Sequence, residues 1–222
     1  VRHSQLGPDG MPKRGDFLPP LPRQMLAGKR ITFITDLRAG DEVWRESTIK
    51  DITIKQGRTG RIVFVTVKAH ISSPRGLAIT EETDLVYRGE PVPNAPPPAP
   101  QPAPGKAVWQ RFVTPNPVLL FRYSALVFSG HRIHYDHPYA TGVEGYPDLV
   151  TNGALTALFV FELVRAHAAA PLKFISARNV RPLFVNQPFA VCGEPSADGK
   201  SAKLWAVDNQ NALVLSATAE FS

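Results

Sequence analysis

Cysteine is almost absent from this chain, which contains one such residue, Cys192, among 222. A single thiol cannot form a disulfide within the chain, and without a companion it cannot nucleate a thiolate zinc site, so disulfide scaffolds and structural-zinc modules are excluded. The sequence also lacks an apolar run long enough to span a bilayer, and it lacks a basic leader followed by an apolar core. These absences predict a soluble protein with no membrane partner, located in the cytoplasm or, in a eukaryote, in the mitochondrial matrix.

Charge of one sign is in excess, but by a small margin. Lysine and arginine number 25 against 19 aspartate and glutamate residues, which gives a net charge of +6. The resulting pI near 9.6 favours anionic partners such as phosphates or carboxylates. Nucleic acid is not expected among them, because the basic residues are scattered and are not clustered with exposed aromatic residues.

Proline divides the chain. Eight of the 22 prolines lie between Glu90 and Gly105, in EPVPNAPPPAPQPAPG, where apolar periodicity is lost. Such a composition is typical of an extended, polyproline-like tether. We therefore expect an N-terminal unit over 1–89, a proline-rich linker over 90–105 and a C-terminal unit over 106–222.

Both units contain the alternating pattern of β-strands. Residues 29–87 favour three or four antiparallel strands with turns near 57–60 and 74–76. In the C-terminal unit, residues 154–170 are apolar on most faces and lack glycine and proline, and Pro171 ends the segment. We therefore expect a buried helix over residues 154–167. Strand patterns then continue to the C-terminus, in LKFISARNV, FAVCGEP, SAKLWAVDN and ALVLSATAEF.

The final strands repeat the first unit. LRAGDEV, which begins at Leu37, aligns with LFVNQPF, which begins at Leu183. GLAITEETDLV likewise resembles NALVLSATAEF. Two copies of one β-rich unit explain this repeat. No counterpart of the apolar helix is evident in the first copy, and we expect it in an N-terminal part that is missing from this sequence or disordered.

Three of the six histidines lie within seven residues: His131, His134 and His137. Imidazole is the side chain best suited to proton transfer near neutral pH, so the cluster marks a candidate site. Three interpretations are open. His131, His134 and Asp136 could bind one metal ion, although no further His or Cys follows at a spacing typical of zinc. The histidines could instead cap turns, above all His137 before Pro138. Alternatively, His134 could be an acid/base group near the free N–H groups of the following helix.

The sequence around the histidines resembles a known family. FSGHRIHYD, followed by EGYPDLVTNGALTALFVFELV, is similar to the MaoC-like (R)-specific hydratase/dehydratase family, and more closely to its branch of mesaconyl-CoA hydratases and mitochondrial-type 3-hydroxyacyl-thioester dehydratases. In the first unit, LGPDGMPKRGDFLPPLP, LRAGDEVWRESTIKDI, GRIVFVTV and LAITEETDLVYR resemble the N-terminal half of the same branch. The resemblance implies an α+β double hot dog, in which two antiparallel sheets each wrap around a central helix.

In this family an aspartate and a histidine five positions apart form the acid/base pair. The resemblance places the histidine on His134, whereas the position of the aspartate holds Ser129. The second proton-transfer group is therefore open among His131, Asp136 and a water molecule held by Ser129.

The family's oxyanion donor is the backbone N–H of a glycine at the start of the central helix, which the resemblance places on Gly153. A glycine lets a thioester oxygen approach the backbone, and the helix dipole favours enolate charge there. Gly153 could also serve only to permit the turn into the helix. Asn152 replaces the histidine that precedes this glycine in the family. Arg122 and Arg132 are nearest to the proposed site and would bind carrier phosphates or a substrate carboxylate.

The resemblance implies reversible hydration of 2-enoyl thioesters, or dehydration of 3-hydroxyacyl thioesters, on coenzyme A or an acyl carrier protein. A mesaconyl-CoA-type branched dicarboxylic substrate is consistent with it, and so is a homo-oligomer. No metal and no redox cofactor is implied. Two other classes remain open: a thioesterase, and a non-catalytic hot dog scaffold or acyl-thioester-binding protein that has lost the aspartate.

Overall fold

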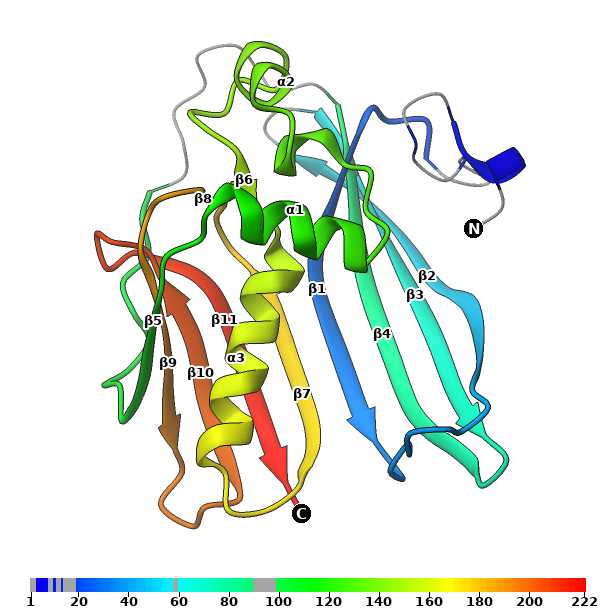
Figure 1. Cartoon of the computed structure of the whole chain (residues 1–222), viewed down its shortest axis with the longest axis vertical. Coiled ribbons are helices and arrows are strands. Elements are labelled where there is room, and N and C mark those ends of the chain that lie inside the picture. Colours follow the sequence, from blue (N-terminus) through cyan, green and yellow to red (C-terminus); the bar gives the residue numbers. More distant parts are fainter. Residues whose placement is uncertain (1–2, 8–9, 11–12, 14–18, 58–59, 90–98) are drawn as a thin grey trace.

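The computed structural model describes residues 3–7, 10, 13, 19–57, 60–89 and 99–222, and its main feature is one long antiparallel sheet (Figure 1). Nine strands follow one another across this sheet in the order β2-β3-β4-β1-β7-β11-β10-β9-β5. Their bounds are β1 (Arg23–Phe33), β2 (Trp44–Gly57), β3 (Gly60–Ser73), β4 (Gly76–Arg88), β5 (Trp109–Val113), β7 (Leu172–Asn179), β9 (Phe189–Pro195), β10 (Ser201–Val207) and β11 (Leu213–Phe221). The expected α+β class is confirmed.

The strand order is mirrored about the centre of the sheet. From the centre outward, the first half contains β1, β4, β3 and β2, and the second contains β7, β11, β10 and β9. The second half has in addition β5, at the edge beyond β9, which has no counterpart among the described strands of the first half. With β5 set aside, each half has its first strand inside, then its last, third and second, which supports the two-copy interpretation. The structure differs from two separate sheets in one respect: β1 and β7 pair directly, so the halves form one continuous sheet.

The seam between the halves is this pairing of β1 with β7. Gly28 lies opposite Arg178 at one end of the seam. A Cβ atom on Gly28 would lie 2.8 Å from the carbonyl oxygen of Ala177, so the two backbones can approach only because glycine has no side chain. Ile31 lies opposite Ile175, and both pack in the core of the second half. The two halves therefore share hydrogen bonds and part of one core.

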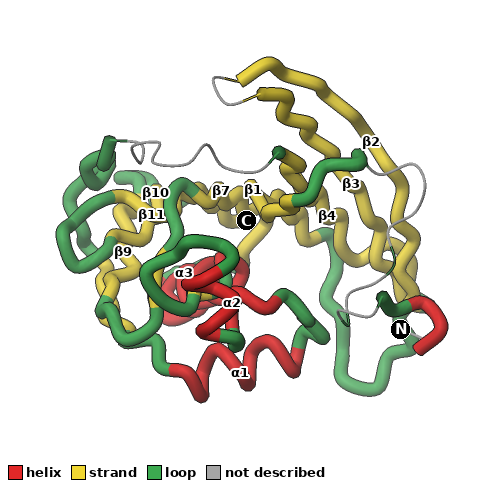
Figure 2. Tube along the Cα trace, turned by 90° about the horizontal axis from the view of Figure 1, so that it is seen from above, coloured by secondary structure: helices red, strands yellow, loops and turns green. Residues whose placement is uncertain are grey.

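The helix α3 (Gly153–His167) lies on one face of the second half (Figures 1 and 2). Its side chains Val160, Leu163 and Val164 are almost fully buried in the core of this half. Burial of each such side chain stabilises the fold by roughly 1.5–3 kcal/mol. The helix is less completely buried than its sequence predicts, because Leu158 is 46% exposed on the opposite side. It ends at His167, as the sequence predicts, and it begins at Gly153, one residue before the predicted start.

The corresponding face of the first half has no such helix within the described residues, which contain in this part only the short 3-10 turn η1 (His3–Gln5). Val63, Val65 and Tyr87 form a small buried cluster there. Farther out, Ile54 of β2 is 64% exposed. The counterpart helix that the repeat predicts is thus not among the described residues.

A cap of short elements lies at the end of the sheet where α3 begins (Figure 1). It contains α1 (Pro117–Leu126), the 3-10 turn η2 (Arg132–His134), α2 (His137–Gly142) and the ribbon of β6 (Val150–Thr151) with β8 (Leu183–Phe184). A small core holds the cap together: Leu120, Ala140, Leu149 and Val185. None of the helices in the described part of the chain has the length and apolar character needed to cross a membrane.

The expected linker falls into two parts. Residues 90–98 lie outside the described residues. Residues 99–105 run against the second half, where Pro102 forms a β-bridge with the turn before β11. Ala103 packs against the buried cluster around Trp205. The described part of the linker is therefore attached to the sheet, and the division into two units remains a prediction.

We predict that the two parts of the linker respond differently to shortening. Deleting Pro96–Pro98 should leave the thermal midpoint nearly unchanged, since the free energy of loop closure varies slowly with loop length. Deleting Gln101–Ala103 should lower the midpoint by several degrees, because the bridge and the packing of Ala103 are lost. Calorimetry measures the thermal midpoints of the two deletion variants, which remove the same number of residues. Equal midpoints would contradict the conclusion that the segment around Pro102 and Ala103 is attached to the sheet.

Candidate active site

His131 and His134 lie in a turn that follows α1. Asn116 caps the start of α1 by accepting a hydrogen bond from the N–H of Leu119 at 2.8 Å. Beyond its end, Phe128 adopts a φ of 54°, a left-handed conformation that a bulky side chain rarely adopts. This strained residue reverses the chain and directs it into the histidine turn.

His134 is buried, with 7% of its surface exposed, and one hydrogen bond fixes its ring. Its Nδ1 lies 2.7 Å from the carbonyl oxygen of Val150. Because a carbonyl can only accept, Nδ1 donates the proton, and Nε2 of the neutral ring remains as an acceptor. Burial lowers the pKa of His134 to about 4; the bond to Val150 opposes this shift, and the charge of His131 adds to it. The imidazole is therefore neutral at physiological pH.

His131 meets His134 edge to face, with ring centroids 5.4 Å apart and ring planes at 89°. Burial lowers the pKa of His131 as well, and the nearby carboxylate of Glu144 opposes that shift. Two imidazoles at this distance do not bind protons independently, since a charge on one disfavours a charge on the other. The structure thus brings two of the three clustered histidines together as a coupled pair.

The hydrogen bond to Val150 brings His134 to the segment that leads into α3. Val150, which binds His134, comes three residues before Gly153, the first residue of the helix. Asn152 caps the helix by accepting from the N–H of Ala154 at 2.9 Å. The N–H of Gly153 belongs to the first turn, where no carbonyl of the helix is available to it, and the positive end of the helix dipole lies there. The bond from His134 to Val150 therefore holds a neutral base close in sequence to the N-terminal end of α3, which favours negative charge.

Gly153 also has a packing role. A Cβ atom on it would lie 2.8 Å from Nδ2 of Asn179, at the end of β7. The same amide donates to the carbonyl oxygen of Leu26 in β1 at 3.1 Å. Asn179 thus fills the space over Gly153 and connects the start of α3 to the first half. A larger residue at position 153 would displace this amide, whatever binds to the N–H of Gly153.

Arg132 and Asp136 bind each other. Nε and Nη2 of Arg132 donate to Oδ2 of Asp136 at 2.9 and 2.7 Å. Asp136 also caps α2, because its Oδ1 accepts from the N–H of Tyr139 at 3.1 Å. The Arg132 guanidinium lowers the pKa of the Asp136 carboxyl and lies 4.1 Å from the centroid of the Tyr139 ring. Both charged groups therefore have structural partners within the turn.

The other predicted residues surround the turn without joining the histidine pair. Arg122 lies on the exposed side of α1. Ser129 is partly buried and directly follows the strained Phe128. His137 begins α2 with a side chain that is 58% exposed and with Nε2 3.6 Å from Oδ1 of Asp148.

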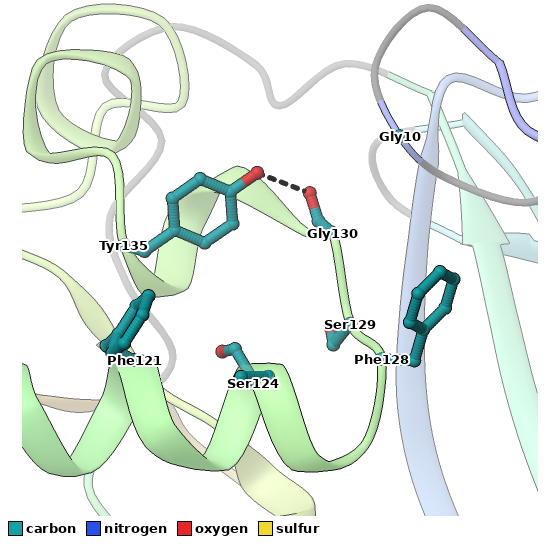
Figure 3. Close-up of a pocket in the computed structure, with 8 residues that line it drawn as sticks. Gly10, Phe121, Ser124, Phe128, Ser129, Gly130 and Tyr135 are labelled. Carbon is teal, nitrogen blue, oxygen red and sulfur yellow. Dashed lines mark hydrogen bonds between the residues drawn. The ribbon is translucent and has the colours of Figure 1, made fainter.

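A hollow of about 260 Å³ opens between α1 and the histidine turn (Figure 3). Its walls are mostly apolar, and the side chain of Ser124 lies at its floor. Ser124 is 5% exposed, and its hydroxyl has no hydrogen-bond partner among the described residues. Tyr135 closes the rim by donating from its hydroxyl to the carbonyl oxygen of Gly130 at 2.9 Å. The lining residues are Gly10, Phe121, Ser124, Ala125, Phe128, Ser129, Gly130 and Tyr135.

Sequence reasoning did not assign a role to Glu144, Arg23 or Asn179. Glu144 opens the quoted segment EGYPDLVTNG, and only its position directly before Gly145 sets it apart in this polar stretch. Arg23 forms an ion pair with Glu144 across more than a hundred residues of chain. Neither Arg23 nor Asn179 has a local signal, because each contacts a residue far away in the sequence.

The geometry gives no support to a metal centre at His131, His134 and Asp136. Throughout the described ranges, no three His, Cys, Asp or Glu side chains are grouped closely enough to hold one ion. Asp136 is bound to Arg132 instead.

Comparison with known proteins identifies the family. The sequence profile of hydroxyacyl-thioester dehydratase type 2 matches residues 1–185. The chain belongs to this family. It is 48% identical over 222 residues to the mesaconyl-C(4)-CoA hydratase of Chloroflexus aurantiacus, a match that covers 98% of this chain and 78% of the relative. The expected relationship to this branch is therefore confirmed.

Solved structures of other proteins have the same fold. HtdX from Mycobacterium tuberculosis superimposes with a TM-score of 0.71 at 19% identity, covering 90% of this chain and 77% of that one. A MaoC-like dehydratase from Phytophthora capsici superimposes with a TM-score of 0.68 at 13% identity, covering 90% and 72%. At these identities the likeness concerns the fold alone.

We predict that burial of His134 makes the protein less stable in mild acid. Its pKa is about 4 in the fold and about 6.5 in an unfolded chain, so between these values the unfolded state binds the additional proton. The contribution is complete above pH 6.5 and is lost as the pH falls toward 4. His134 alone should remove about 2 kcal/mol of unfolding free energy between pH 7.5 and pH 5.

Urea unfolding at both pH values measures this loss. The His134→Phe variant keeps a ring in the buried position but cannot titrate, so it should show a smaller dependence on pH. An equal loss of stability in both proteins would show that His134 is not the group responsible.

Proposed function

We propose that this member of the type 2 dehydratase family is a hydro-lyase, which adds water to 2-enoyl thioesters and removes it from 3-hydroxyacyl thioesters. The observation that carries the proposal is the bond from His134 to Val150, which holds a neutral, buried imidazole beside the start of α3. This arrangement supplies proton transfer and stabilisation of a negative oxygen in one place. The activity in the names of the family and of the bacterial relative is the same reaction.

In the direction of hydration, Nε2 of His134 accepts a proton from water while the water oxygen bonds to C3 of the enoyl group. The electron pair of the C2–C3 double bond moves toward the carbonyl, which gives an enolate with its charge on the thioester oxygen. The N–H of Gly153 and the positive end of α3 stabilise that oxygen. A second group then delivers a proton to C2, and the reverse sequence expels water.

His131 is our first choice for the second group. Its ring is in contact range of His134, and it can both donate and accept a proton. Asp136 is a weaker candidate because Arg132 and the N–H of Tyr139 already occupy its oxygens. Ser129 could act only by holding a water molecule, since its hydroxyl does not ionise at neutral pH.

The substrate that we propose is a thioester of coenzyme A or of an acyl carrier protein, including acyl groups of the branched dicarboxylic, mesaconyl type. The net charge of +6 favours the phosphates of either carrier. Arg122 is exposed and able to meet a phosphate or carboxylate, whereas Arg132 is bound to Asp136. These steps call for no metal or redox cofactor, and a cytoplasmic location and a homo-oligomer remain predictions of the sequence.

A thioesterase is the second candidate, and the charges near the turn argue against it. It would need a carboxylate or similar base that activates water for attack on the carbonyl carbon. Two carboxylates near the turn already have cationic partners, Asp136 with Arg132 and Glu144 with Arg23. Release of free thiol from an enoyl-CoA would indicate the thioesterase, whereas loss of enoyl-thioester absorbance without thiol release would indicate hydration.

We predict that His134 is indispensable and that His137 is not. Replacing His134 with alanine removes the proposed base and should lower hydration of an enoyl-CoA at least a hundredfold. His137→Ala is the matched control, because its side chain is exposed and lies at the start of α2. Absorbance assays on a small panel of enoyl-CoAs measure both rates. Equal rates for folded wild type and His134→Ala would remove the basis of the proposal.

The second proton-transfer group can be identified by three single variants. We expect His131→Asn to lower kcat by about a hundredfold with KM little changed, since only a proton-transfer step is affected. Asp136→Asn should act mainly on stability through the cap of α2, and Ser129→Ala should cause a small change. The pH profile of kcat in each variant is the deciding measurement. If no variant loses an ionisation or more than a fewfold in rate, His134 works without a partner from this turn.

A further inference from the structure

The hollow between α1 and the histidine turn has no role in the proton-transfer steps described above. Ser129 and Gly130 line this hollow and directly precede His131, so it lies next to the proposed proton-transfer groups (Figure 3). Its volume of about 260 Å³ is below the roughly 300–1,000 Å³ that is typical of pockets for drug-sized ligands. The space is therefore sufficient for an acyl group and too small for a whole acyl-CoA.

The walls of the hollow indicate what it can hold. Phe121, Ala125 and Phe128 contribute to a mostly apolar surface, and none of the lining residues carries a charge. The phosphates of a carrier would find no cation among these residues, and burial of an unpaired charge is costly. The hollow is therefore suited to the hydrocarbon of an acyl group and not to the phosphates of its carrier.

The hydroxyl of Ser124 is the unusual feature of this hollow. Ser124 is 5% exposed, its side chain points from α1 into the hollow, and its hydroxyl has no hydrogen-bond partner within the described residues (Figure 3). A serine inside a helix often donates to the carbonyl oxygen four residues earlier, but no such bond to Leu120 forms here. A buried hydroxyl without a partner is unfavourable, so an oxygen brought by a ligand would be stabilised at this point.

Phe121 lies beside this hydroxyl. Solvent does not reach the hydroxyl of Ser124, so a ligand can meet it only when a neighbouring side chain moves. Phe121 lines the same hollow and is 64% exposed, and Figure 3 shows its ring next to Ser124. Exposed side chains change rotamer within picoseconds to nanoseconds. Rotation of the Phe121 ring therefore opens the hollow toward the hydroxyl without disturbing a packed core.

We propose that this hollow is the acyl subsite of the enzyme and that Ser124 is a specificity-determining residue, whose hydroxyl binds an oxygen carried by the acyl group beyond C3. The assignment rests on the proposed function, in which C2 and C3 react at His131 and His134. From there the acyl group extends past Gly130 and Ser129 into the hollow. An uncharged oxygen suits walls without a cation best, and the carboxylate of a dicarboxylic acyl group is the other source of the same acceptor.

Binding of saturated acyl-CoAs tests the subsite without catalysis, because these thioesters have no double bond to hydrate. Butyryl-CoA, 4-hydroxybutyryl-CoA and succinyl-CoA have acyl chains of equal length that end in a methyl, an alcohol and a carboxylate group. In calorimetric titrations of the full chain, Ser124→Ala should bind 4-hydroxybutyryl-CoA about fivefold more weakly than wild type and butyryl-CoA equally well. A loss with succinyl-CoA as well would show that a carboxylate uses the same hydroxyl. Ser216→Ala is the matched control, because it removes a hydroxyl from β11, which contributes no residue to the hollow.

Stability and a second variant complete the test. Ser124→Ala should leave the thermal midpoint unchanged or raise it, because the free protein loses no hydrogen bond of this hydroxyl. Ala125→Leu narrows the hollow and should weaken the binding of all three thioesters. Unchanged binding in Ala125→Leu, or equal affinities of wild type and Ser124→Ala for both oxygen-bearing thioesters, would overturn the proposal. A selective loss of binding in Ser124→Ala, in a protein whose wild type hydrates no enoyl-CoA, would support the subsite and contradict the proposed function.

Discussion

The central pairs of β1 and β7, from Gly28 opposite Arg178 to Thr32 opposite Phe174, make one sheet out of two similar halves. This seam permits no side chain at Gly28, and its register fixes how the strands of one half are placed against those of the other. Ile31 enters the core under α3 through the seam, and the start of β1 comes to the end of the molecule where α3 begins. The active-site cap is built by the second half but is completed by the first.

The two halves have taken different roles in spite of their mirrored strand order. The second half has the helix, the histidine turn and the cap, whereas the described part of the first half contributes four strands, a buried cluster and two polar contacts. Those contacts are the ones that reach the site, Arg23 to Glu144 and Leu26 to Asn179. A half without a catalytic turn of its own among the described residues thus acts as a support that fixes the geometry of the other.

Local patterns in the sequence predicted most of the elements, while contacts across the seam could not be predicted. The helix from Gly153 and the strands after it follow from apolar periodicity, and the histidine cluster stood out by its density. Spacing alone could not separate the buried His134 from the exposed His137, because their difference arises from the turn after Phe128 and the bond to Val150. The same limit applies to Arg132 and Asp136, whose mutual pairing depends on the short turn between them. The end of the helix at His167 was placed correctly, ahead of three alanines and Pro171.

The seam has a practical consequence for how the molecule can be divided. A cut within residues 90–98 would produce two fragments. Each would present the open edge of one strand, β1 or β7, whose backbone groups match those of the other. Reassociation would rebuild the buried contact of Arg23 with Glu144 at the same time as the sheet. The protein is therefore suited to fragment complementation, in which recovered activity reports that two separately produced pieces have met.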